Sequence, residues 1–402
     1  MKKIKIYQSV FLVLLVFFTH ACVEQIDIET LTFEDVLVVE AIITNELKHQ
    51  EIKLSRSIKF ENEEPIYESN AEVKIIDDSN TYFFKEVSEG KYLSIEEFNA
   101  QPNRNYQLLI TTKNGKSYVS KEVELTTVTQ IDEVYASREI DGFGNEGISI
   151  FVDSYDPKNN SKYYRYEYEE TYKIIAPYWS PFDMVVVDDR YIVKKLKTKE
   201  EKTCYNSLIS NTIIQTETTG LTDDRVSKFE VRFIPRNDPI ISHRYSIMVK
   251  QYVQSLDAYS YYKTLNKLSG GSGNIFSQNQ PGFFNGNIFS KDNIEEKVIG
   301  FFEAASVSSK RIFFDYYDFF PEEALPPYFI ECELFAPSTT MDAGDPSLLM
   351  ELLKAGKVKY YMKNPNYPNP QNENEGKYYV VEAPCGDCTE LGTNIKPDFW
   401  VD

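Results

Sequence analysis

The sequence YQLLITTKNGKSYVSKEVEL, from Tyr106 to Leu125, indicates most clearly how this chain folds. Apolar and polar residues alternate from Tyr106 to Ile110, which is the two-residue period of a half-buried β-strand. Asn114-Gly115 follows, a dipeptide that favours the tight turn between two antiparallel strands. Residues 118–125 then have the composition of the returning strand. We therefore predict a β-hairpin over residues 106–125.

The same kind of pattern fills the sequence before this hairpin. A β-branched run spans residues 36–44, and the turn signal Asp77-Asp78-Ser79-Asn80 separates two further short strands. About seven short strands with regularly spaced turns are typical of an antiparallel sandwich. We therefore predict an immunoglobulin-like or fibronectin-like sandwich over residues 36–128. Tyr106, which opens a late strand, is expected to serve a structural corner there and no chemistry.

The rest of the chain, residues 129–402, is longer and less regular, and we predict a larger β-rich domain with a few short helices. Two helices are expected, at residues 255–268 and after Asp345 as N-cap, the second ending before Gly356. The predicted strands of this region are 163–172, two within 231–253, 298–302 and 311–316.

The N-terminus has the pattern of a lipoprotein signal peptide over residues 1–21. Three lysines precede the apolar run Val10–Phe18, which is too short to span a bilayer. Ala21-Cys22 then resembles the lipobox of bacterial lipoproteins. That resemblance implies cleavage before Cys22 and its modification by diacylglycerol and an acyl chain such as palmitate, which together give a lasting membrane anchor. Ordinary signal cleavage after Ala21 is the alternative. Acidic residues 22–35 are expected to form a tether.

The composition of the chain excludes several kinds of partner. The 402 residues include 43 Lys and Arg against 62 Asp and Glu, and removal of residues 1–21 leaves a net charge of −22. Such a charge argues against nucleic acid and against a polybasic grip on lipid. Only His49 and His243 remain in the mature chain, which leaves little room for a histidine-based zinc or catalytic site. We therefore expect no cofactor and no metal.

Four cysteines remain once Cys22 is lipidated, an even number that suits an oxidising compartment. They are Cys204, Cys332, Cys385 and Cys388. The motif Cys385-Gly-Asp-Cys388 resembles a redox pair, but the residues after it, with Gly392 and Pro397, do not predict the helix that lowers a catalytic thiol's pKa. We expect two structural disulfides, with three pairings open, and a Cys₄ zinc site as the alternative.

Other motifs point to chemistry only weakly. Residues 141–147 offer the oxygens of a calcium loop without its order, so a surface turn is expected. Residues 270–273 lack the Lys-Ser/Thr of a phosphate-binding loop. Asp315 with Asp318, or Glu322 with Glu323, could form the acid–base pair of a hydrolase. Because such pairs arise by chance in an acidic chain, we predict that the protein is not an enzyme.

The segment from Ala176 to Phe182, APYWSPF, places three aromatic residues around two prolines in a predicted loop. Tyr178, Trp179 and Phe182 could stack on a sugar or anchor a protein partner. The alternative is that Trp179 caps a β-sheet core.

Several segments together resemble one family and cover nearly all of the mature chain. They are LVVEAIITN (37–45), YQLLI with GKSYVS (106–120), YYRYEYEETY (163–172), DRV with RFIP (224–235), YSIMVKQY (245–252), QPG with GNI (280–288), EKVIGFFEAASV (296–307), and CGDC with GTNIKPDFW (385–400). This combination is similar to the domain-of-unknown-function 4249 lipoproteins of Bacteroidetes-type outer membranes. These are often encoded beside a SusC-like TonB-dependent transporter, and the family has no established catalytic residues.

The resemblance implies a lipoprotein of the outer membrane. Together with the lipobox, the aromatic loop and the absence of catalytic motifs, it favours a non-enzymatic protein, on the periplasmic or cell-surface face, that helps a TonB-dependent β-barrel transporter to capture or take up cargo. One alternative is a structural or assembly module of the envelope that has no ligand of its own. The other is a surface hydrolase with an Asp/Glu pair.

Overall fold

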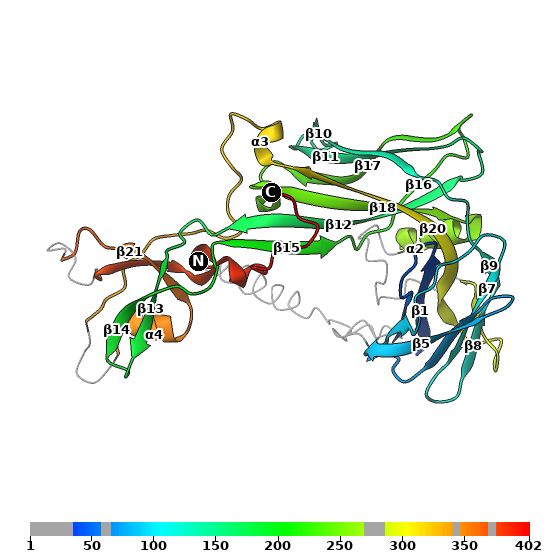
Figure 1. Ribbon diagram of the computed structural model, residues 1–402, viewed down its shortest axis with the longest axis horizontal. Helices are drawn as coiled ribbons and strands as arrows, with labels where there is room; N and C mark the ends of the chain where they lie inside the picture. Colours follow the sequence, from blue (N-terminus) through cyan, green and yellow to red (C-terminus); the bar gives the residue numbers. More distant parts are fainter. Residues whose placement is uncertain (1–34, 58–65, 269–285, 341–345, 369–374) are drawn as a thin grey trace, which may run out of the picture. The chain divides into compact units, whose positions relative to one another are not determined.

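β-Strands dominate the computed structural model, which describes residues 35–57, 66–268, 286–340, 346–368 and 375–402 (Figure 1). The mainly β prediction with a few short helices is confirmed. The largest sheet contains β1 (Leu37–Thr44), β2 (Glu51–Arg56), β3 (Ile66–Tyr67), β4 (Glu72–Ile76), β5 (Thr81–Ser88), β6 (Lys91–Ser94), β7 (Asn105–Thr111), β8 (Ser117–Ser120), β9 (Val123–Glu124), β12 (Tyr163–Ile175), β15 (Thr203–Ile209), β16 (Ile214–Glu217), β18 (Tyr245–Gln254), β19 (Ile288–Ser290) and β20 (Val298–Phe314).

Three smaller sheets and several short helices complete the described part of the chain. The smaller sheets are β10 (Ile131–Ile140), β11 (Glu146–Asp156) and β17 (Asp224–Pro235); β13 (Phe182–Val187) and β14 (Tyr191–Leu196); and β21 (Val358–Lys363) and β22 (Tyr378–Glu382). The helices are α2 (Leu256–Leu268), α3 (Tyr316–Phe319), α4 (Leu348–Lys354) and α5 (Ala383–Gly386), with the 3₁₀ turns η1 (Pro239–Ile241) and η2 (Cys388–Glu390).

The central strands of the largest sheet run in the order β15-β12-β18-β20-β1-β2, so strands from both halves of the sequence are neighbours. Strand β1 pairs in parallel with β20, which places Leu37 beside Val298 and Thr44 beside Ala305. The separate sandwich predicted for residues 36–128 is therefore not shown, because its strands belong to this mixed sheet. Nothing in a local alternation of apolar residues can show that β1 pairs with a strand about 260 residues later.

The predicted local elements are largely confirmed. Strands β7 and β8 form the hairpin around Gly115, whose φ of +84° suits glycine. Strands β4 and β5 form the hairpin whose turn is held by the Asp77 carboxylate, which accepts hydrogen bonds from two backbone N–H groups. The Tyr106 hydroxyl accepts a hydrogen bond from the Gln101 N–H at 2.8 Å, as a structural corner requires.

Two predicted boundaries were wrong. Residues 298–302 and 311–316 were expected as separate strands, but β20 is continuous over Val298–Phe314, because β1 pairs with its first half and β18 with its second half. Helix α4 begins later than predicted, because its N-cap is Ser347, whose side chain accepts a hydrogen bond from the Met350 N–H. Asp345, the predicted cap, lies outside the described residues.

Two large hydrophobic clusters lie on the sheets. One joins the inward residues of β1, β2 and β4–β8 to β19 and β20. The other joins β10–β12, β17, β18 and α3. On β12, Tyr164 and Tyr166 enter the second cluster, and the residues between and after them, Arg165 and Glu167, point to the opposite face. The second face of the central strands is therefore free to form a polar site.

Candidate functional site

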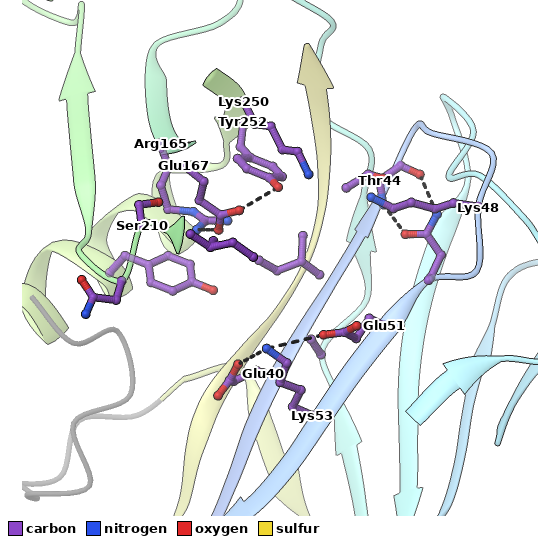
Figure 2. Close-up of a pocket in the computed structure, with 16 residues that line it drawn as sticks. Glu40, Thr44, Lys48, Glu51, Lys53, Arg165, Glu167, Ser210, Lys250 and Tyr252 are labelled. Atoms are coloured by element: carbon purple, nitrogen blue, oxygen red, sulfur yellow. Dashed lines mark hydrogen bonds and ion pairs between the residues drawn. The ribbon is translucent and has the colours of Figure 1, made fainter. Parts of the chain in front are cut away.

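A polar pocket of about 540 Å³ lies on the face of the central strands opposite the large clusters (Figure 2). Strands β1, β2, β12 and β18, helix α2, the residues just before β2, and the end of β15 with the two residues after it form its walls. The lining residues are Glu40, Ala41, Ile42, Thr44, Lys48, Gln50, Glu51, Lys53, Arg165, Glu167, Ile209, Ser210, Asn211, Lys250, Tyr252 and Tyr262.

Strand register brings these side chains together. Arg165 on β12 lies opposite Tyr252 on β18, and Glu167 lies opposite Lys250. Across the sheet, Glu40 on β1 lies opposite Lys53 on β2. Side chains two residues apart on a strand share a face. The cross-strand pairs Arg165–Tyr252 and Glu167–Lys250 therefore lie next to each other on the face that lines the pocket.

Arg165 forms the inner wall of the pocket and is only 1% exposed. Its guanidinium lies over the rings of Tyr252, at 4.6 Å, and Tyr262, at 5.0 Å. Its Nη1 donates to Glu167 Oε1 at 2.6 Å, and Glu167 also accepts from the Tyr252 hydroxyl at 2.9 Å. The Nε and Nη2 atoms of Arg165 are buried without a hydrogen-bond partner among the described residues.

Glu303 on β20 lies behind Arg165, with Oε1 at 3.7 Å from Nη2, which is beyond hydrogen-bond distance. Burial raises the pKa of Glu303 above its ordinary value, although the charge of Arg165 lowers it in part. Burial would also raise the pKa of Glu167, but the charge and hydrogen bond of Arg165 outweigh it and hold that pKa below its ordinary value. Two acids that share one arginine are thus shifted in opposite directions.

Glu40 occupies another wall, with its side chain 22% exposed. Lys53 Nζ lies 3.7 Å from its Oε2 and 3.4 Å from Glu51 Oε1. Burial raises the pKa of Glu40 to about 7, against the lowering effect of Lys53. Glu51 also accepts a hydrogen bond of 2.7 Å from Lys91. Burial acts to raise the pKa of Glu51, but Lys91 and Lys53 outweigh it and hold that pKa below its ordinary value.

Lys250 differs from the other cations of the pocket. Its ammonium makes no hydrogen bond or ion pair with any residue of the described ranges, and no dashed line reaches it in Figure 2. Lys48, by comparison, contacts Glu46 at 2.6 Å.

A comparison with protein families gives a match. The family model described as "Domain of unknown function (DUF4249)" matches residues 23–311, which is well over half of the chain. The chain belongs to the DUF4249 family. No curated protein matches it. All the pocket residues of this DUF4249 protein lie within the matched range, whereas α4, β21, β22 and three of the four disulfide cysteines lie beyond it.

The four cysteines after Cys22 in this DUF4249 protein form two disulfides, Cys204–Cys388 and Cys332–Cys385. The expectation of two structural disulfides is confirmed, and the structure decides between the three possible pairings. Cys385 lies in the short helix α5, and Cys388 is the first residue of the 3₁₀ turn η2. We predicted no helix after the motif, and the structure has only this single short turn there. Cys22 lies outside the described residues.

The aromatic loop is packed against its surroundings. Trp179 contacts the cluster that contains β12 and β18, and its ring lies 5.6 Å from Lys202 Nζ. Tyr178 donates its N–H to the Cys385 carbonyl, and Phe182 packs against the small cluster of α4 and β21. These contacts fit the alternative in which Trp179 caps a core, and a ligand-binding role for the loop stays a prediction.

The other motifs form ordinary contacts. The Asp141 carboxylate accepts from the N–H groups of Phe143 and Asn145, as in a surface turn. Asp315 pairs with Arg244 at 2.6 Å, and Glu323 pairs with Arg138 at 2.9 Å. Within the described ranges, no group of three or more His, Cys, Asp or Glu could hold a metal ion. Nor does any described helix combine the length and apolar character that crossing a membrane requires.

Sequence reasoning missed the pocket itself. A signal was present, because strands of this region carry charges in otherwise apolar or aromatic runs: Glu40 in LVVEAIIT, Arg165 and Glu167 in YYRYEY, and Glu303, which lies behind Arg165, in GFFEAAS. A buried charge in such a run needs a partner from another strand. The pattern could have identified the residues as a set, but it could not have placed them together.

Proposed function

We propose that this DUF4249 protein is a non-enzymatic, lipid-anchored protein of the outer membrane that captures small polar cargo for a TonB-dependent transporter. The single observation that supports it best is the pocket on the central strands. Its volume of about 540 Å³ lies in the range of small-molecule sites, and charged and polar side chains make up most of its lining.

Unpaired donors are the part of this pocket that folding alone does not explain. Each buried polar atom without a partner costs about 1–3 kcal/mol, and most such atoms in native proteins are paired. Arg165 lines the pocket and keeps two nitrogens buried without a hydrogen bond, which packing alone does not explain.

The anchor and the transporter form the second part of the proposal. It rests on the lipobox-like Ala21-Cys22 and on the resemblance to DUF4249 lipoproteins, which implies a SusC-like transporter as the partner. Replacement of Cys22 by serine should move the protein from the membrane fraction to the soluble fraction and abolish its co-purification with a β-barrel. A Cys22→Ser protein that stays in the membrane would contradict the anchor.

Loss of cargo uptake separates this function from that of an envelope module without a ligand. Cells that carry Lys250→Met should keep the anchored protein and its barrel partner but lose uptake of the cargo. If the protein were an envelope module without a ligand, cells that lack the whole gene would take up the cargo normally. Unchanged uptake of every candidate cargo in such cells would refute cargo capture.

Hydrolysis is a second candidate because one observation favours it. Glu40 and Glu167 line the same pocket, and their pKa values are shifted in opposite directions, a pattern typical of acid–base pairs. Glu167, however, already accepts bonds from Arg165 and Tyr252, which oppose its action as a base. Release of nitrophenol from aryl glycosides by the wild-type protein, and its loss in Glu40→Gln, would establish this alternative and overturn the non-enzymatic proposal.

A further inference from the structure

Four large apolar side chains are exposed around the end of the largest sheet at which β1 begins. Ile66 and Tyr67 form β3, and Val87 lies near the end of β5; each is about half exposed. Ile294, in the loop before β20, is 90% exposed. Single exposed apolar residues are common on protein surfaces, but several at one end of a molecule mark a contact with a partner or a membrane.

Strand register places β3 and the start of β20 at the same level of the sheet. Leu37 on β1 lies opposite Arg56 on β2 and opposite Val298 on β20. Arg56 in turn lies opposite Ile66. Neighbouring strands are about 4.8 Å apart, so Ile66 and Val298 lie roughly 14 Å from each other across the start of β1. Ile294 comes four residues before Val298.

Polar contacts hold β3 and the turn after β5 in place. The Arg56 side chain donates to Glu68, the residue after β3, at 2.6 Å. Gly90, in the turn that follows Val87, lies against Tyr67, because a Cβ atom at Gly90 would be only 3.0 Å from the Tyr67 ring. The exposed side chains of β3 and β5 are therefore neighbours.

The loop that carries Ile294 is fixed in the same way. Glu296 accepts hydrogen bonds from Lys116 at 2.7 Å and from the Tyr118 hydroxyl at 2.9 Å. Residues 291–297 include two lysines and three acids, so their charges nearly balance. A contact through this loop is therefore apolar and does not depend on a basic patch.

The predicted membrane anchor is joined to the body at this end. Asp35 is the first described residue and precedes β1, and Cys22 lies 13 residues before it. A chain of that length spans at most about 45 Å, so a lipid on Cys22 keeps the start of β1 within that distance of a bilayer. Tethering of this kind raises the effective concentration of the surface, which allows even a weak contact to form.

We propose that the end of the body formed by Ile66, Tyr67, Val87 and Ile294 rests on the lipid surface that holds Cys22. Aliphatic side chains enter the apolar boundary of a bilayer, and tyrosine suits the interface because its ring is apolar and its hydroxyl is polar. The inference rests on the anchor of the proposed function and adds which end of the protein meets the lipid.

Such an orientation is compatible with cargo capture. On β1 the pocket is lined from Glu40 to Thr44, whereas the proposed contact surrounds Leu37. At about 3.3 Å per residue, Thr44 lies roughly 23 Å along the strand from Leu37. The far end of the pocket is therefore held away from the lipid contact.

Quenching of tryptophan by brominated lipid tests this proposal. Full-length lipidated Ile294→Trp and Tyr67→Trp proteins are inserted into vesicles of dibrominated phosphatidylcholine and of ordinary phosphatidylcholine. Wild-type protein gives the background of Trp179 and Trp400. Both variants should lose fluorescence in the brominated vesicles beyond this background, because bromine quenches a tryptophan that lies in the bilayer interface.

Phe143→Trp is the matched control, since Phe143 is an apolar residue that is 95% exposed in the turn between β10 and β11. Arg138 on β10 donates to the Phe319 carbonyl, which lies beyond the C-terminal end of β20. That end of β20 is roughly 50 Å along the strand from Val298. Phe143→Trp should therefore show no quenching beyond the wild-type background.

Three results would overturn the proposal in protein that sediments with the vesicles. They are no quenching at positions 294 and 67; equal quenching at position 143; or a change in fluorescence at positions 294 and 67 only when the purified barrel is added, which would assign this end to a protein partner. Protein that does not sediment with the vesicles would refute the anchor itself, and this inference with it.

Discussion

Replacement of Glu40 by glutamine should stabilise this protein at alkaline pH, although it removes one partner of an ion pair. In the folded state burial raises the pKa of Glu40 from its ordinary value of 4.5 to about 7. Between these two values the folded protein holds a proton that the unfolded chain has released. Stability therefore falls as the pH rises through this window, and the full penalty is present above about pH 7.

The size of the effect follows from the same two values. At about 1.4 kcal/mol per pH unit, the difference corresponds to an upper limit of about 3 kcal/mol. Because the Glu40 side chain is 22% exposed and water can relax around it, we expect a gain of about 1–2 kcal/mol at pH 8. At pH 5 Glu40 is protonated in the folded protein, so glutamine should change the free energy of unfolding little.

Urea unfolding of wild-type and Glu40→Gln proteins at pH 5, 6.5 and 8 measures this effect, with tryptophan fluorescence as the signal. The quantity compared at each pH is the difference in the free energy of unfolding between the two proteins. Glu303 and His243 also have shifted pKa values, and this difference removes their contribution, which both proteins share. Glu51→Gln is the matched control in the same pocket. Its pKa is lowered, so that its charged form stabilises the fold above its ordinary pKa, and its loss should destabilise the protein at pH 8. A Glu40→Gln protein no more stable than wild type at pH 8 would refute this reasoning.

Three further predictions concern the fold. Arg165→Met should destabilise the protein by about 3–5 kcal/mol, because it leaves buried acids without their cation, and urea unfolding at pH 7.5 measures the loss. Gly300→Ala should cost more than about 3 kcal/mol, since φ is +150° and the new Cβ would lie 2.3 Å from the Val39 carbonyl oxygen; Gly142→Ala, where nothing lies within 4 Å, is the neutral control. Replacing Cys204 and Cys388 by serine opens a link across 184 residues and should lower stability by about 5 kcal/mol, seen as a lower urea midpoint.

The sequence predicted those features of the fold that depend on neighbours along the chain. The Asn114-Gly115 turn, the alternation of β12 and the helix over residues 256–268 all follow from local periodicity and turn chemistry. The even number of cysteines after Cys22 predicted two disulfides, although the sequence could not decide between their pairings. The errors lie where a distant strand decides the outcome, as in the continuous β20, which pairs with β1 along its first half and with β18 along its second half.

By itself, then, the sequence determined a mainly β chain, its hairpins, its disulfide cysteines and its membership of the DUF4249 family, since each of these is written in residues that lie close together or in a recognisable combination. Only the tertiary structure decided that β1 pairs in parallel with β20 and that Glu40, Arg165 and Lys250 share one pocket. The physical reason is that strand partners are chosen by the burial of whole faces and by hydrogen bonds between distant segments, and neither has a local signature in the chain.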